Sequence, residues 1–85
     1  MASILLVDDE KTIHSFLTYL LGKRGHEVDG ALSGFLALEK VAEKTYDLYL
    51  IDLDMPEMSG EELIRRFREE GRDTPVIILS GLEES

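Results

Sequence analysis

Three short apolar runs constrain the fold of this chain more than any other feature of its sequence. They are ILLV at residues 4–7, LYLI at 48–51 and VIIL at 76–79. A continuous apolar run closed by polar or turn-forming residues is typical of a strand that is buried on both faces. Such strands occur in parallel sheets with helices on either side, so the runs predict an α/β fold.

The segments between these runs have the spacing of amphipathic helices. Residues 10–23 place apolar side chains on one helical stripe, which consists of Ile13, Phe16, Leu17, Leu20 and Leu21. Asp9 is the expected N-cap of this helix. Ser33 is expected to cap a second helix at 34–44, and Ser59 a third helix after the third strand.

A mixed segment, HEVDGA at residues 26–31, predicts a half-exposed strand at the edge of the sheet. The complete element order is therefore βαβαβαβ. This order predicts a parallel sheet with right-handed crossovers and with helices on both faces. The sequence contains no linker, repeat or low-complexity tract, so residues 1–85 are expected to form a single domain.

The charge of the chain excludes several classes of function. Its formal net charge is −9, and a polyanion of this kind is repelled by phosphate backbones and anionic membranes. We therefore expect no direct nucleic-acid binding. The absence of cysteine excludes disulfides and thiolate chemistry, and the N-terminus resembles neither a signal peptide nor a membrane span. A cytoplasmic protein without membrane contact is the expectation.

Polar side chains, most of them carboxylates, follow the apolar runs at the point where each strand should end. Asp8 and Asp9 follow the first run, Asp52 and then Asp54 follow the central one, and Ser80 follows the last. In open parallel sheets, ligands bind beyond the carboxyl ends of the strands. If the first and third strands are neighbours, these groups meet in one crevice. Two like charges about 4 Å apart repel by about 4 kcal/mol at an effective dielectric constant of about 20, so a cation is expected.

The chemistry of these side chains favours Mg²⁺ and phosphoryl transfer. All the ligand atoms are oxygens, which suits a hard divalent ion held by a few carboxylates and waters. A further carboxylate can attack a phosphoryl group and form an acyl phosphate, while the ion neutralises the charge on the phosphoryl oxygens. The hydroxyl of Ser80 could then bond to a phosphoryl oxygen. His14 and His26, away from the strand ends, are expected to be solvated surface residues.

Three segments carry a resemblance to a known family. ILLVDDE, DLYLIDLDMPEMSG and PVIILSG resemble, in order and spacing, the receiver domain of two-component response regulators. The resemblance runs from residue 3 to residue 81. It implies a flavodoxin-like, doubly wound parallel sheet with strand order 2-1-3-4 in this chain. It also implies that the final helix, strand and helix of the family pattern are missing, so residues 1–85 would be a C-terminally truncated receiver-like domain.

The resemblance also implies a role for each acidic residue. Asp52 resembles the phosphoacceptor, and it would be a metal ligand as well. Asp9 resembles a direct Mg²⁺ ligand, with Asp8 beside it, often through water. Asp54 would supply its backbone carbonyl to the metal, and Ser80 would be the switch hydroxyl. The phosphoryl donor would be a histidine kinase or a phosphotransfer protein.

Other readings of the sequence remain open. The lysine that the family carries on strand five has no counterpart here, which argues for a non-phosphorylated dimerisation module with the same fold, whereas the intact acidic set argues against it. The D-x-D of LIDLD also resembles haloacid-dehalogenase-type phosphohydrolases, but Met55 and Pro56 follow it where those enzymes have Thr or Val. An enzyme is not expected, beyond self-catalysed phosphoryl transfer. An uncovered sheet face and an apolar edge at VIIL predict a homo-oligomer.

Overall fold

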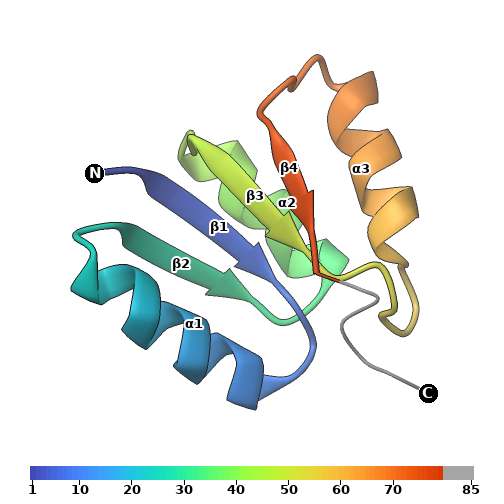
Figure 1. Cartoon of the computed structure of the whole chain (residues 1–85). Coiled ribbons are helices and arrows are strands. Elements are labelled where there is room, and N and C mark those ends of the chain that lie inside the picture. The colour runs from blue at the N-terminus through green and yellow to red at the C-terminus, as the bar shows by residue number, and fades with distance from the viewer. Residues whose placement is uncertain (80–85) are drawn as a thin grey trace.

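The structure is a computed structural model that describes residues 1–79 and contains three helices and four strands in strict alternation (Figure 1). In chain order the elements are β1 (Ser3–Val7), α1 (Lys11–Lys23), β2 (Glu27–Ala31), α2 (Gly34–Glu43), β3 (Leu48–Ile51), α3 (Gly60–Glu69) and β4 (Val76–Ile78). The predicted βαβαβαβ order is confirmed. None of the helices in the described range combines the length and the apolar character that a membrane crossing requires.

The strands form one parallel sheet in the order β2-β1-β3-β4, as the resemblance implies. The two central strands are β1 and β3, whose last residues, Val7 and Ile51, lie in register beside each other. The chain winds outward from β1 to β2 and then crosses back to β3 on the other side of β1 (Figure 1). The carboxyl ends of β1 and β3 therefore flank the point where the winding reverses, which is where such sheets bind ligands.

Apart from Ser3, the central strands are apolar because they are covered on both faces. Along β1, Leu5 and Val7 belong to a cluster on one face of the sheet, and Ile4 and Leu6 to a cluster on the other. The helical residues of the first cluster are Ala37 and Val41 of α2 and Leu63 and Phe67 of α3. Alternate side chains of a strand point to opposite faces, so a strand between two layers needs apolar residues at every position.

Within residues 1–79, α1 is the helix that covers the other face of the sheet, and it covers that face less completely. Leu17 and Leu21 pack against the smaller cluster, but Phe16 is 57% exposed and Leu20 is 41% exposed. These two side chains of the predicted apolar stripe therefore lie largely in solvent rather than against the sheet. A single helix contacts the sheet along a narrow line, so the flanks of a wide stripe stay in solvent.

Serine side chains begin two of the helices as predicted. The Oγ of Ser33 accepts the backbone N–H of Leu36 at 3.1 Å at the start of α2. The Oγ of Ser59 accepts the N–H of Glu62 at the same distance at the start of α3. Each bond satisfies one of the backbone donors that a helix N-terminus leaves unpaired.

The predicted cap of α1 is wrong. Glu10, not Asp9, occupies the N-cap position, and it makes no capping bond with its side chain. The carboxylate of Asp8 instead accepts the backbone N–H of Glu10 at 2.9 Å. The helix begins one residue later than expected, so the two aspartates belong to the loop between β1 and α1.

Candidate metal centre

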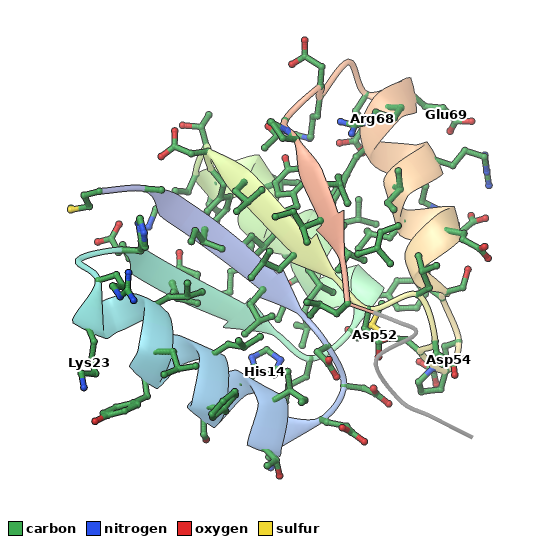
Figure 2. All side chains as sticks on the ribbon, viewed as in Figure 1. His14, Lys23, Asp52, Asp54, Arg68 and Glu69 are labelled. Carbon is green, nitrogen blue, oxygen red and sulfur yellow. The ribbon has the colours of Figure 1, made fainter. Side chains whose placement is uncertain are left out.

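The register of the sheet brings two acidic segments together. Asp8 and Asp9 follow Val7 at the end of β1, and Asp52 follows Ile51 at the end of β3. The parallel pairing continues past the strands, because the N–H of Asp52 donates to the backbone oxygen of Val7 at 2.9 Å. Figure 2 shows Asp52 at the end of β3, beside the loop that follows β1.

The three carboxylates form one cluster. One oxygen from each of Asp8, Asp9 and Asp52 lies within 4.8 Å of the other two. Asp8 is buried, Asp52 is half-buried and Asp9 is exposed, so the cluster opens to solvent on one side. These hard oxygen donors fit Mg²⁺, which is commonly held by one or two carboxylates and retained waters. Asp8 and Asp9 would hold the ion next to the Asp52 carboxylate.

Burial raises the pKa of the Asp8 carboxyl above its ordinary value, because the residue is only 4% exposed and water solvates its charge poorly. The negative charges of Asp52 and Asp9 raise the pKa further. The hydrogen bond from the N–H of Glu10 acts in the opposite direction. The ionised form of Asp8 is thus held at a cost that a divalent cation would offset.

Asp54 lies in the loop that follows β3, on the side that faces solvent (Figure 2). Its backbone N–H donates to Oδ1 of Asp52 at 3.1 Å and so helps to orient that carboxylate. The role assigned to the Asp54 backbone carbonyl, as a metal ligand, stays a prediction. Ser80, the predicted switch hydroxyl, lies outside the described residues.

The loop after Asp52 is anchored in the core. Met55 and Met58 are both buried in the cluster formed with α2 and α3. Between them, Glu57 has a φ of 69°, a left-handed conformation that is uncommon for a residue with a side chain. The N–H of Met58 donates to the oxygen of Pro56 at 2.7 Å, which closes this tight turn. The backbone next to the acidic cluster is therefore held by packing rather than left to vary.

Two histidines interpreted as solvated are in fact partly buried and hydrogen-bonded, so that prediction is wrong. Nε2 of His14 lies 2.6 Å from the backbone oxygen of Asp8, and the imidazole ring packs over Gly30 of β2. Nδ1 of His26 accepts the N–H of Ala2 at 3.0 Å. Gly30 was a usable signal, since a glycine inside a strand often marks a close approach by another group.

Fold and site together define a class of protein, a doubly wound parallel α/β domain with an oxygen-lined acidic cluster at the strand ends. Comparison with protein families then identifies the family. The response regulator receiver domain matches residues 4–85, and the chain belongs to that family. Receiver domains are signalling modules of two-component systems.

Individual relatives agree with this assignment. The chain is 42% identical over 78 residues to the two-component response regulator PhoP of Pseudomonas aeruginosa, covering 92% of this chain and 35% of PhoP. It is similar to the response regulator TrrA of Thermotoga maritima in complex with Mg²⁺ and BeF, with 38% identity, a TM-score of 0.81, and coverage of 92% of this chain and 66% of that one.

A further structure contains TrrA in complex with the histidine kinase ThkA, with 37% identity, a TM-score of 0.88, and coverage of 99% of this chain and 72% of that one. The chain spans little more than a third of the length of curated response regulators such as PhoP.

Proposed function

We propose that this chain is a phosphoacceptor module in which Asp52 takes a phosphoryl group from a histidine kinase or a phosphotransfer protein, in a reaction that depends on Mg²⁺. The module comprises residues 1–85 and acts in the cytoplasm. The observation that carries the proposal is the cluster of Asp8, Asp9 and Asp52, with their oxygens within 4.8 Å of one another at the ends of β1 and β3.

The chemistry requires one nucleophile and one leaving group in line. An oxygen of Asp52 attacks the phosphorus, the bond between phosphorus and the donor's histidine nitrogen breaks, and an acyl phosphate forms on Asp52. When bound, Mg²⁺ neutralises charge on the phosphoryl oxygens. Asp8, Asp9 and Asp52 would hold the ion together with the backbone carbonyl of Asp54. The N–H of Asp54 fixes the orientation of the attacking carboxylate of Asp52.

Two structures of one relative support the partners assigned here. One solved response regulator binds Mg²⁺ together with BeF, and in another structure the same regulator is bound to a histidine kinase. In our proposal Ser80 supplies the hydroxyl that bonds to the transferred group. The match to the receiver-domain family also favours a receiver over a phosphohydrolase.

The direct test is incubation with acetyl phosphate and Mg²⁺, followed by intact mass measurement. We expect one phosphoryl adduct on the wild type, none on Asp52→Asn, and none on the wild type when the metal is chelated. Asp73→Asn, which removes an exposed carboxylate from another loop, is the matched control and should be modified like the wild type. An adduct that persists in Asp52→Asn would contradict the assignment of the phosphoacceptor, and repeated turnover of a phosphomonoester would point to the phosphohydrolase.

A second proposal concerns association of the 85-residue polypeptide with itself. β4 forms one edge of the sheet, and its Ile77 and Ile78 are 52% and 47% exposed. An apolar edge strand offers both hydrogen-bonding groups and apolar surface to another chain. We infer that two copies associate through β4 or through the adjoining sheet face that α1 leaves uncovered. This contact is also what a non-phosphorylated dimerisation module would use.

A further inference from the structure

His14 connects three parts of the molecule at the acidic end of the sheet. It lies on the first turns of α1, and its half-buried side chain projects toward the sheet (Figure 2). Its Nε2 is 2.6 Å from the backbone oxygen of Asp8, in the loop between β1 and α1. Its ring covers Gly30 on the neighbouring strand β2. One side chain therefore links the helix, the metal-binding loop and the sheet.

The contact with Asp8 has a fixed direction. A carbonyl oxygen only accepts hydrogen bonds, so Nε2 must carry the proton and donate it. Asp8 is held at two further points, because its N–H donates to the oxygen of Ala31 at 3.1 Å and its carboxylate accepts the N–H of Glu10 at 2.9 Å. The bond from His14 fixes the carbonyl of the same residue. It thereby sets the plane of the peptide that joins Asp8 to Asp9.

Gly30 makes room for this arrangement. A Cβ at position 30 would lie 2.9 Å from Cε1 of His14 and still closer to Nδ1, which is well inside contact distance. A methyl group there would push the ring away and pull Nε2 off the Asp8 carbonyl. Glycine weakens a strand interior, and its presence in β2 is explained by the ring that lies over it.

We propose that His14 is a positioning residue for the acidic cluster. Its hydrogen bond to the Asp8 carbonyl holds the loop so that the carboxylates of Asp8 and Asp9 face Asp52. Groups that orient metal ligands from behind affect metal affinity by about 10-fold to 100-fold, so the same bond is expected to strengthen Mg²⁺ binding. Only this consequence for Mg²⁺ rests on the proposed function, because the positioning of the loop is a property of the protein without metal.

The first test therefore uses the metal-free protein. Amide hydrogen exchange of Glu10 reports whether its bond to the Asp8 carboxylate is intact. We expect this amide to exchange about tenfold faster in His14→Ala, as the loss of a supporting hydrogen bond predicts. His14→Gln, whose side-chain amide can donate from a similar position, should return the rate to within about threefold of the wild type. His26→Ala, which removes a histidine bonded to Ala2 instead, should leave the Glu10 amide unchanged.

The second test compares Mg²⁺ affinity by calorimetric titration. His14→Ala and Gly30→Ala are each expected to weaken binding by about tenfold. The double variant should bind Mg²⁺ about as tightly as the single variant with the lower affinity. Both changes break the same bond, so their effects on affinity should not add. Full additivity would show that Gly30 acts by another route and would overturn the pairing.

The outcomes separate this proposal from the proposed function. If the wild type binds no Mg²⁺, the metal-dependent function fails, while the exchange rate of Glu10 still decides whether His14 orders the loop. If His14→Ala lowers thermal stability but leaves both the Glu10 exchange rate and the Mg²⁺ affinity unchanged, the histidine only supports packing and the positioning role is overturned.

Discussion

Asp8 shows how a single residue can favour a site at the expense of stability. It is 4% exposed and lies against two other carboxylates, so its ionised form is unfavourable in the folded protein. We expect Asp8→Asn to raise the free energy of unfolding of the metal-free protein at pH 7 by about 1 kcal/mol, which is typical of changes that relieve a functional site. The amide oxygen can still accept the N–H of Glu10. Thermal unfolding without metal measures the effect, and Mg²⁺ affinity should fall in the same variant.

The pH dependence of this difference has a definite sign. The pKa of Asp8 is raised above 3.8 in the folded state, so folding binds a proton at intermediate pH. The penalty is absent below the unfolded pKa and becomes complete as the pH rises through the folded pKa. The stability advantage of Asp8→Asn should therefore vanish near pH 3 (a value about one unit below the ordinary aspartate pKa) and be largest at neutral pH. A stability advantage of Asp8→Asn that is the same at pH 3 and at pH 7 would contradict the role of burial.

The residues of the acidic cluster could be predicted from the sequence, whereas the residue that supports it could not. Asp8, Asp9 and Asp52 directly follow apolar runs, and parallel strands bring their carboxyl ends to one edge. His14 bonds to the backbone carbonyl of Asp8, and the direction of a backbone carbonyl cannot be predicted from the pattern of side chains. Its partner is defined only once α1 lies on the sheet. The raised pKa of Asp8, for the same reason, depends on how deeply the finished fold buries it.

At the scale of the element, the sequence predicts the features that depend on interactions between residues close together in the chain. Ser33 and Ser59 cap their helices because an N-cap bond spans only three residues. The start of α1 differs from the prediction because the carboxylate of Asp8, which belongs to the acidic cluster, accepts the N–H of the N-cap residue Glu10. Phe16 belongs to the apolar stripe of α1 and is nevertheless exposed, because a single helix covers only part of the sheet. Such questions depend on tertiary packing, which the period of a helix does not specify.

Two glycines provide a matched pair of substitutions on the elements around the site. Gly60 begins α3, and a Cβ there would lie 2.7 Å from the Cα of Leu53 and closer still to the backbone oxygen of Asp52. Backbone atoms cannot move aside cheaply, so Gly60→Ala should lower the free energy of unfolding by about 1–3 kcal/mol. Gly22 lies in α1 with nothing within 4 Å of an added Cβ, so Gly22→Ala should raise it by about 0.5–1 kcal/mol.

Urea unfolding of the two glycine variants measures both changes. Gly60→Ala should also reduce phosphorylation by acetyl phosphate, because the added methyl group displaces the loop that carries Asp52. Gly22→Ala should be phosphorylated like the wild type. Two alanine variants of equal stability would show that the close approach of Gly60 to the loop imposes no constraint.

At the scale of the whole molecule, charge and apolar surface act in opposite directions. Each copy carries a formal charge of −9, which repels a second copy over several ångströms. The exposed isoleucines of β4 attract it at contact: Ile77 pairs with Leu50 of the α1 face, and Ile78 with Ile51 of the opposite face. Salt screens the first effect and leaves the second nearly intact. Self-association through this edge should therefore strengthen as ionic strength rises.

Sedimentation velocity at low and high salt tests this expectation. We expect a reversible dimer of the wild type whose dissociation constant falls with added salt, and a monomer for Ile77→Lys, because lysine on an edge strand blocks pairing. The substitution makes the net charge less negative, so a loss of association could not be attributed to stronger repulsion. Thr45→Lys, at an exposed turn between α2 and β3, adds the same charge elsewhere and should remain a dimer. A wild type that stays monomeric at both ionic strengths and at high protein concentration would rule out β4 as a contact between copies.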